Sequence, residues 1–188
     1  MKISDYILQY DELAKAQEIV FFGGSFNPWH EGHTSCIRLL PADLPIVIVP
    51  DHNPFKKLTK THEKLTSPAQ IVKQIQFLNR NIFIYDGFFI REEKNPTNVW
   101  INELKLHLPM TKISFLVGYD TFMAMPKWIN IEKLLKDLDC LYVASRLEND
   151  QHHSEDAQQL YPAENKLEIK FLGHHNFEHL SSTELRKS

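Results

Sequence analysis

Residues 21–33 read FFGGSFNPWHEGH, which joins an apolar run to two glycines, an Asn-Pro turn and two histidines three positions apart. Gly23 and Gly24 have no Cβ, so the chain can turn sharply after the run and a ligand can approach the main-chain amides. A helix is expected to begin at His30 or Glu31, where free N–H groups and the positive end of the helix dipole favour a phosphate. The stretch therefore predicts a strand, a turn and a helix that together bind a phosphorylated ligand.

The two histidines allow three interpretations. His30 and His33 would share one face of the first helical turn, and Gly32 between them would leave room for a ligand. They could simply cap the helix. They could hold zinc, although the spacing differs from that of the two-histidine zinc motif, and no third ligand stands at a suitable spacing. They could also donate hydrogen bonds to phosphate oxygens, and the complete string GGSFNPWHEGH favours this third interpretation.

Outward from this stretch, apolar runs alternate with helical patterns along the whole chain. The expected strands are 18–24, 45–50, 81–87, 112–118, 140–146 and 166–173, and the expected helices are 31–40, 67–79, 98–107, 131–137 and 154–160. Strands that are apolar throughout and separated by helices predict a doubly wound α/β fold, in which helices cover both faces of a parallel sheet. Such sheets bind ligands at the carboxyl ends of their strands, where the strand order reverses.

One domain is expected, with an extra helix before it. An apolar stripe at helical spacing covers residues 3–16 and consists of Ile3, Tyr6, Ile7, Tyr10, Leu13 and Ala14. This stripe is expected to pack against the domain, and a contact between two copies of the chain is the alternative. No linker-like stretch divides the rest, so the predicted organisation is a helical extension over 1–17 and one domain over 18–188. Polar loops are expected over 50–66 and 147–157.

Composition and charge narrow the function classes. The 188 residues are 43% apolar and 24% charged, which is ordinary for a globular chain, and the formal net charge of −3 excludes a broad basic surface for a nucleic acid polymer. The N-terminus is too polar for a signal peptide, and no apolar run reaches the roughly 20 residues of a membrane span. A cytoplasmic protein without a membrane partner is therefore expected. Cys36 and Cys140 are expected to be reduced thiols, with a disulfide as the alternative.

The end of the chain carries a second candidate phosphate site. Residues 179–188 read HLSSTELRKS, and Ser181 and Glu184 have the spacing of a capping box. A helix that begins there would offer hydroxyl groups, free amides and the guanidinium of Arg186, a fork-shaped cation that suits a phosphate. A short terminal helix without a binding role is the alternative.

Both strings resemble motifs of the HxGH nucleotidyltransferase superfamily. GGSFNPWHEGH resembles its G-[GS]-[TS]-F-[DN]-P-x-H-x-G-H signature, and LSSTELR resembles its I-S-S-T-x-[IV]-R motif, in the same order along the chain. Between them, LVGYDTFMAMPKW (116–128) resembles a segment of nicotinate and nicotinamide mononucleotide adenylyltransferases. VPDHNPFKK (49–57) resembles their P-H-K loop, and VASR (143–146) resembles a strand that they share. The resemblance covers residues 19–188 and implies their Rossmann-like nucleotidyltransferase fold.

The resemblance implies transfer of AMP from ATP to a pyridine mononucleotide, which yields a dinucleotide of NAD biosynthesis and pyrophosphate, with Mg²⁺ accompanying ATP. The attacking 5′-phosphate is already an anion at neutral pH, so the enzyme must align two anions and neutralise phosphate charge rather than supply a base. The implied catalytic residues are His30, His33, Lys56 and Arg186. The implied ATP-binding residues are Gly23, Gly24, Ser25, Phe26, Gly32, Gly118, Asp120, Ser181, Ser182 and Thr183, and the implied mononucleotide-binding residues are Asn27, Thr97, Trp100 and Trp128.

Several of these residues have a second interpretation. Asp120 would accept hydrogen bonds from ribose hydroxyls, or it would make an Asx turn in a loop. Trp128 and Trp100 would offer a flat apolar surface to the pyridine ring, or they would pack in the core. The sequence departs from the family pattern at two positions, and the departure at Val99 leaves nicotinate and nicotinamide as alternative substrates. Phe55 replaces the histidine of the P-H-K loop, and Val99 replaces a threonine that in nicotinate enzymes helps to hold the carboxylate.

Two other functions stay as alternatives. One is a different HxGH transferase of the pantetheine-phosphate or cytidylyl type, although those enzymes usually carry Thr-x-G-H or a different C-terminal string. The other is a nucleotide-binding regulator without turnover, against which the retained histidines and cations argue. An aminoacyl-tRNA synthetase is disfavoured, because 188 residues with a net negative charge leave no body to bind tRNA. The oligomeric state, including a homo-oligomer, is left open.

Overall fold

The structure is a computed structural model that describes residues 1–51, 66–93, 97–144, 155, 160–161, 166–177 and 180. Its strands are β1 (Glu18–Gly24), β2 (Ile46–Pro50), β3 (Ile82–Ile84), β4 (Lys112–Gly118), β5 (Cys140–Ala144) and β6 (Glu168–Phe171). Its helices are α1 (Ile3–Leu8), α2 (Asp11–Ala14), α3 (Glu31–Leu39), α4 (Pro68–Ile75), α5 (Gly87–Ile90), α6 (Thr97–His107), α7 (Tyr119–Ala124) and α8 (Ile131–Asp137), with the short 3-10 helices η1 (Gln76–Leu78) and η2 (Met125–Lys127).

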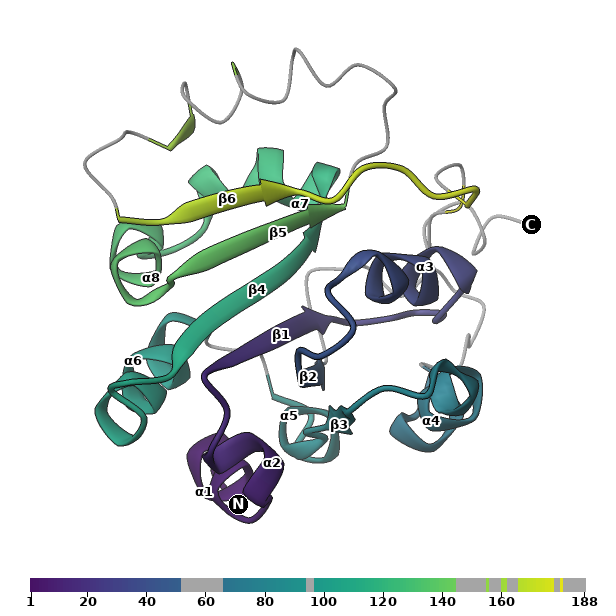
Figure 1. The fold of residues 1–188 in the computed structure, drawn as a ribbon, viewed down its shortest axis with the longest axis horizontal. Helices are drawn as coiled ribbons and strands as arrows, with labels where there is room; N and C mark the ends of the chain where they lie inside the picture. Colours follow the sequence, from purple (N-terminus) through teal and green to yellow (C-terminus); the bar gives the residue numbers. More distant parts are fainter. Residues whose placement is uncertain are drawn as a thin grey trace.

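The strands form one parallel sheet in the order β3-β2-β1-β4-β5-β6 (Figure 1). The chain moves outward from β1 through β2 to β3, then returns to the centre and moves outward again from β4. The strand order therefore reverses between β1 and β4, which pair in register from Glu18 with Lys112 to Phe21 with Phe115. This arrangement confirms the predicted doubly wound α/β fold, and it places the carboxyl ends of β1 and β4 side by side.

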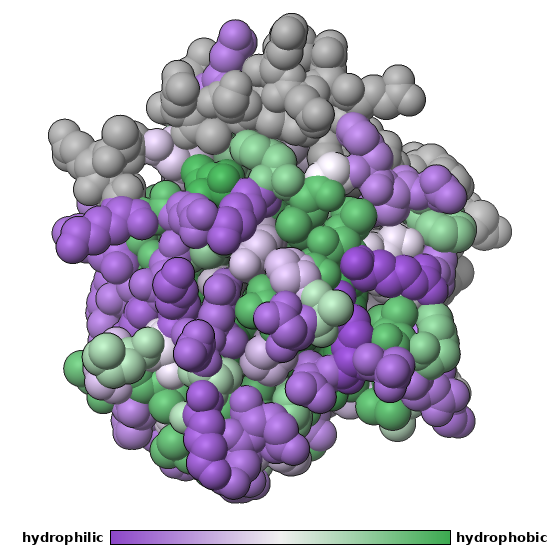
Figure 2. All heavy atoms as spheres, viewed as in Figure 1, coloured by the Kyte–Doolittle hydropathy of each residue, from purple (hydrophilic) through white to green (hydrophobic). Residues whose placement is uncertain are grey.

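Each face of the sheet packs against its own apolar cluster, because successive strand side chains point to opposite faces. In β1, Ile19 and Phe21 join one cluster, which α1, α2, α5, α6, α7 and α8 complete. Val20 and Phe22 join the other, which α3 and α4 complete. Both faces are thus covered by helices, and polar side chains occupy much of the outer surface in the view of Figure 2.

The N-terminal segment differs in one respect from the expected helix over 3–16, because it consists of the two helices α1 and α2. Tyr10 between them is extended (φ −112°, ψ 115°). Its ring centroid lies 5.0 Å from that of Tyr6 and 5.0 Å from that of Phe83 on β3, so these two aromatic contacts accompany the break. The expected packing of the stripe against the domain is confirmed, since Ile7 and Leu13 are fully buried in the core.

Other elements agree with the expectations in part. β1 and β4 have the predicted bounds, whereas β3 is shorter than 81–87, and α5 begins at Gly87, the last residue of the predicted strand. Helices α5 and α7 were not predicted. The helix expected over 154–160 and the loops expected over 50–66 and 147–157 lie largely outside the described residues. No helix in the described part of the chain is long and apolar enough to cross a membrane.

Candidate functional site

A cleft of about 410 Å³ opens at the carboxyl ends of β1 and β4, where the strand order reverses. Its lining comes from both strands, from the end of β2 and from the first turns of α6 and α7. The lining residues are Phe22, Gly23, Gly24, Ser25, Asp51, Thr97, Phe115, Leu116, Val117, Gly118, Asp120, Thr121, Ala124 and Trp128. Open α/β sheets bind ligands at this place, so the cleft is the candidate site.

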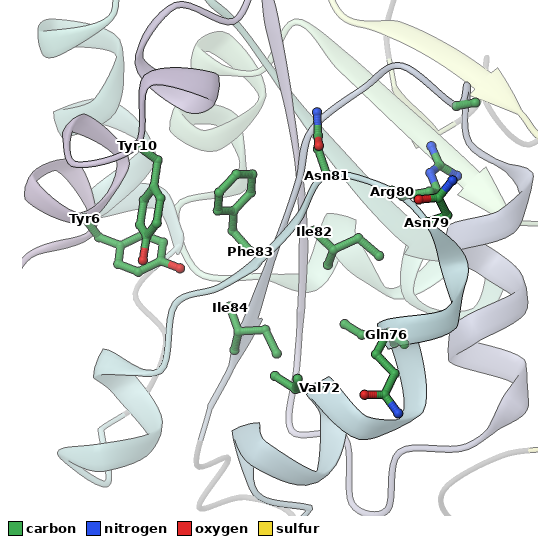
Figure 3. Close-up of a pocket in the computed structure, with 12 residues that line it drawn as sticks. Tyr6, Tyr10, Val72, Gln76, Asn79, Arg80, Asn81, Ile82, Phe83 and Ile84 are labelled. Atoms are coloured by element: carbon green, nitrogen blue, oxygen red, sulfur yellow. The ribbon is translucent and has the colours of Figure 1, made fainter.

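A second cavity, of about 750 Å³, lies beside the edge strand β3 (Figure 3). The N-terminal helices, α4 and the turn before β3 form its walls. Tyr6, Tyr10, Gln76, Arg80 and Phe83 are among the side chains that line it. Its described lining shares no residue with the cleft and contains none of the predicted site residues. The cleft at the reversal of strand order is therefore the candidate, although the other cavity is larger.

Many of the residues predicted from the sequence line the cleft. They are Gly23, Gly24, Ser25, Thr97, Gly118, Asp120 and Trp128. The segments that carry them are far apart in the chain, and the sheet brings them together at the carboxyl ends of its strands (Figure 1). The residues predicted from the second motif and from the lysine loop lie outside the described residues. They are Lys56, Ser181, Ser182, Thr183 and Arg186.

The glycines of the cleft have different surroundings. A Cβ added at Gly118 would meet no heavy atom within 4 Å, and its backbone (φ −75°, ψ 157°) suits any residue. The open space beside Gly118 is therefore available to a ligand. A Cβ at Gly24 would instead lie 3.2 Å from the ring of Phe26, which packs beneath the turn.

His30 and His33 are organised by the first turn of α3. His30 is the N-cap residue, and its Nδ1 accepts the Gly32 N–H at 3.2 Å. Nδ1 of His33 accepts the His30 N–H at 3.2 Å, and the two ring centroids are 3.8 Å apart. Because a backbone N–H occupies each Nδ1, the hydrogen of each neutral ring lies on Nε2. The histidines thus cap the helix through Nδ1, and the N–H of each neutral ring is on Nε2.

Gly32 has a different role from the one expected. A Cβ there would lie 2.9 Å from the His30 ring and 3.3 Å from the carbonyl oxygen of Phe177. The protein itself therefore fills the space that was expected for a ligand. Glycine at this position allows the His30 imidazole and the segment around Phe177 to pack against the helix.

Aromatic side chains hold the ring of His33. Its centroid lies 5.2 Å from that of Phe26 and 5.1 Å from that of Trp29. Trp29 is fixed in turn, since its backbone N–H donates to Thr66 Oγ1 at 2.8 Å and its Nε1–H donates to Thr34 Oγ1 at 3.0 Å. Phe26 is only 3% exposed and is not among the lining residues of the cleft, so the structure places it as a support for the histidine turn.

Two predicted mononucleotide-binding residues do not line the cleft. Trp100 is 3% exposed, and its ring centroid lies 4.9 Å from that of Phe21 and 5.9 Å from that of Phe115. This is the core packing that the sequence left as the alternative. Asn27 is also buried, within the turn between β1 and α3.

Asp51 lines the cleft but was not predicted. It follows β2, and its backbone N–H donates to the carbonyl oxygen of Gly24 at 3.1 Å. Its place directly after an expected strand is the signal that could have found it, because the carboxyl ends of parallel strands share one edge. With Asp120 it gives the cleft two carboxylates. Among the residues that the structure describes, no group of three His, Cys, Asp or Glu side chains could hold a metal ion.

The chain has a parallel sheet with a glycine-bordered cleft at its reversal of strand order, and a histidine-capped helix follows the first of the two strands, although neither histidine is among the described lining residues of the cleft. This arrangement defines a nucleotide-binding α/β domain. The comparisons with known proteins name its family. The chain belongs to the cytidylyltransferase-like family, whose model matches residues 21–188. The family resemblance predicted from the two motifs is thereby confirmed.

Relatives and solved structures agree with this family. A protein of Leptospira interrogans named "Probable nicotinate-nucleotide adenylyltransferase" is 28% identical over 89% of the chain and 82% of its own length. One of Aliarcobacter butzleri with the same name is 30% identical over 63% of the chain and 66% of its own length. The structure of Plasmodium falciparum nicotinic acid mononucleotide adenylyltransferase complexed with NaAD superposes with a TM-score of 0.67 at 21% identity, over 91% of this chain and 83% of that one, which supports the fold.

Proposed function

We propose that the protein is an adenylyltransferase that moves AMP from ATP to nicotinate mononucleotide, forming a dinucleotide of NAD biosynthesis and pyrophosphate. The observation that carries the proposal is the cleft at the carboxyl ends of β1 and β4, in which glycines, three hydroxyl-bearing residues, two carboxylates and a tryptophan from distant segments converge. The relatives named for this activity support the choice of substrate. Nicotinamide mononucleotide is the alternative acceptor.

The chemistry requires alignment rather than proton transfer. A 5′-phosphate oxygen of the mononucleotide forms a bond to the α-phosphorus of ATP, while the bond from that phosphorus to the bridging oxygen breaks and pyrophosphate leaves with its electron pair. The Nε2–H groups of His30 and His33 donate hydrogen bonds to the phosphate oxygens that gain charge. Such a fixed donor stabilises a transition state by about 2.7–4 kcal/mol. The proposed cations are Lys56 and Arg186.

The mononucleotide is proposed to occupy the side of the cleft formed by Thr97 and Trp128. Trp128 is 36% exposed at the cleft, so its indole face is accessible to a pyridine ring. The hydroxyl of Thr97, the first residue of α6, is a candidate partner for the base or its phosphate. On the ATP side, the carboxylate of Asp120 is proposed to accept hydrogen bonds from the ribose hydroxyls of ATP.

Mg²⁺ is the proposed metal, bound chiefly to the phosphates of ATP. Magnesium sites in nucleotide enzymes use one or two carboxylates together with substrate phosphates, and Asp51 and Asp120 are the carboxylates of the cleft. When bound, the ion neutralises phosphate charge. ATP and a mononucleotide as substrates also support the proposal of a cytoplasmic enzyme.

A pyrophosphate-release assay with ATP and Mg²⁺ tests the function. Nicotinate mononucleotide, nicotinamide mononucleotide and pantetheine phosphate are compared as acceptors, and CTP is compared with ATP as the donor. The proposal expects the highest kcat/KM with ATP and nicotinate mononucleotide, and mass spectrometry should identify the dinucleotide product. Release only with pantetheine phosphate or CTP would favour another transferase of the superfamily. Tight ATP binding without release would favour a regulator.

A further inference from the structure

His175 connects the segment after β6 to helix α3. Its Nε2 lies 3.7 Å from Sγ of Cys36, which is 8% exposed. Cys36 follows His33 by three residues, so the two stand one helical turn apart on the same side of α3. In Figure 1 this segment runs from the end of β6 toward α3. His175 thus contacts the helix whose first turn carries the histidine pair.

The protonation of His175 follows from a second contact. The backbone N–H of Phe177 donates to Nδ1 of His175 at 3.2 Å, so Nδ1 carries no hydrogen. In the neutral ring the hydrogen is therefore on Nε2, which donates to the sulfur of Cys36. The imidazole of His175 thus contacts its own segment through Nδ1 and helix α3 through Nε2.

Phe177 extends this connection to both phosphate motifs. Its carbonyl oxygen lies 3.3 Å from the position of a Cβ on Gly32, and it accepts the N–H of Leu180 at 3.0 Å. Gly32 belongs to the first motif, and Leu180 is the residue directly before Ser181. One peptide carbonyl therefore lies beside the N-terminal turn of α3, next to Gly32, and is hydrogen-bonded to the start of the second motif.

We propose that His175 is a positioning residue for ATP, which holds the start of the second motif against the first turn of α3 through Cys36 and Phe177. This inference rests on the proposed function, in which both motifs bind the phosphates of one ATP. His175 is not among the described lining residues of the cleft, so it acts through its neighbours rather than on the ligand. If the separation of the two binding segments is fixed before ATP arrives, a larger fraction of the protein is competent to bind. The apparent affinity for ATP then rises by the same factor as this fraction.

The variant His175→Ala tests the proposal, and His174→Ala, a change of the exposed neighbouring histidine, is its matched control. Loss of one hydrogen-bonded connection should raise KM for ATP about tenfold. The kcat and the KM for the mononucleotide should stay within about twofold, because the chemical step uses the same groups once ATP is bound. His174→Ala should leave all three parameters at their wild-type values.

The contact with Cys36 is tested by a double-mutant cycle. Cys36→Ala alone should raise KM for ATP by a similar factor, and the double variant should rise no further than either single variant. Effects of His175→Ala and Cys36→Ala that simply multiply would show that the two side chains act independently, which would overturn the proposed route.

A structural readout independent of turnover is the alkylation rate of Cys36, measured by mass spectrometry of its peptide. The rate should increase in His175→Ala and decrease when a non-hydrolysable ATP analogue is present. Cys140 is the internal control, since it is 2% exposed and burial raises the pKa of its thiol to about 12. An unchanged Cys36 rate in His175→Ala would contradict the proposed link.

Two outcomes separate this inference from the proposed function. The inference alone is overturned if His175→Ala keeps wild-type turnover and an unchanged KM for ATP. It is also overturned if this variant loses thermal stability with no rise in KM for ATP. If the wild-type protein releases no pyrophosphate with any acceptor, the proposed function fails. Calorimetry with ATP then still decides whether His175→Ala weakens nucleotide binding.

Discussion

His33 combines a structural and a proposed chemical role at opposite sides of one ring. Nδ1 accepts the His30 N–H as part of the capping box of α3, and Nε2–H is the proposed phosphate donor. His33→Ala should therefore lower turnover at least about 100-fold. It should also lower the free energy of unfolding by about 0.5–2 kcal/mol, because a capping acceptor is lost. Pyrophosphate release and urea unfolding measure the two effects.

His33→Gln separates these roles. Glutamine is a usual residue at this capping-box position, and Gln70 occupies it in α4, where its Oε1 accepts the Ser67 N–H at 2.7 Å. The variant should regain most of the unfolding free energy that His33→Ala loses, while turnover stays as low as in His33→Ala. Turnover at the wild-type level would show that the transfer does not need the imidazole.

Gly118 and Gly32 provide a matched pair of glycine substitutions. Gly118→Ala adds a Cβ to open space at the cleft, so the midpoint of thermal unfolding should stay unchanged while KM for ATP rises about tenfold. Gly32→Ala places a Cβ against the His30 ring and the Phe177 carbonyl, so it should lower stability by about 1–3 kcal/mol and turnover as well. Thermal unfolding and steady-state kinetics distinguish them. Loss of stability in Gly118→Ala would contradict the assignment of that space to a ligand.

At the scale of elements, α3 is fixed at its carboxyl end by Arg80. The guanidinium donates to the carbonyl oxygens of Ile37, Leu40 and Pro41, and burial lowers the pKa of Arg80 without removing its charge at neutral pH. Arg80→Met should lower the free energy of unfolding by about 2–3 kcal/mol, because these carbonyls lose a charged donor. Arg80→Lys should lie in between, since an ammonium cannot reach several carbonyls as a planar fork does. Urea unfolding measures both, and wild-type stability of Arg80→Met would refute this role.

The central elements could be predicted because their own sequence determines them. β1 and β4 are apolar almost without interruption and end at glycines, so their bounds agree with the predicted ones. Helices α5 and α7 have four and six residues, too few for a periodic pattern, and they were missed. The break between α1 and α2 depends on contacts of Tyr10 with aromatic side chains, one of which, Phe83, lies far along the chain.

The same distinction applies to the candidate site. Gly24, Gly118 and Asp120 were found because they follow predicted strands or belong to recognisable motifs. A tryptophan serves equally in a core or against a ligand, so the sequence could not decide where Trp100 lies. The link from His175 to Cys36 depends on a turn and on two elements that no local pattern connects.

At the scale of the whole molecule, the sheet order produces the site. Residues 21–33 and 116–128 are far apart in the chain, because β2, α4, β3, α5 and α6 lie between them. β1 and β4 are nevertheless neighbours in the sheet, and both end at the cleft. The segment after β6 then crosses back to α3, where the Phe177 carbonyl oxygen accepts the N–H of Leu180 and lies 3.3 Å from the position of a Cβ on Gly32. The proposed binding of one ATP by both motifs requires this return of the chain to α3.

The N-terminal segment belongs to the same core as the sheet. Ile3, Ile7 and Leu13 are buried in the cluster on one face, and the hydroxyl of Tyr85 donates to the carbonyl oxygen of Met1 at 2.8 Å. Truncating one such aliphatic side chain to alanine costs about 2–5 kcal/mol, and a whole domain is stable by only about 5–15 kcal/mol. Deletion of residues 1–17 should therefore prevent cooperative folding.

Ile7→Ala gives this prediction a variant that still folds. Ile7 is 0% exposed and Leu8 is 49% exposed, so Ile7→Ala should lower the free energy of unfolding by about 2–5 kcal/mol and Leu8→Ala by less than about 0.5 kcal/mol. Since neither residue lines the cleft, kcat should be unchanged in both. Urea unfolding followed by circular dichroism measures the difference. If 18–188 instead unfolds cooperatively with the stability of the full chain, the core of the domain is complete without α1 and α2.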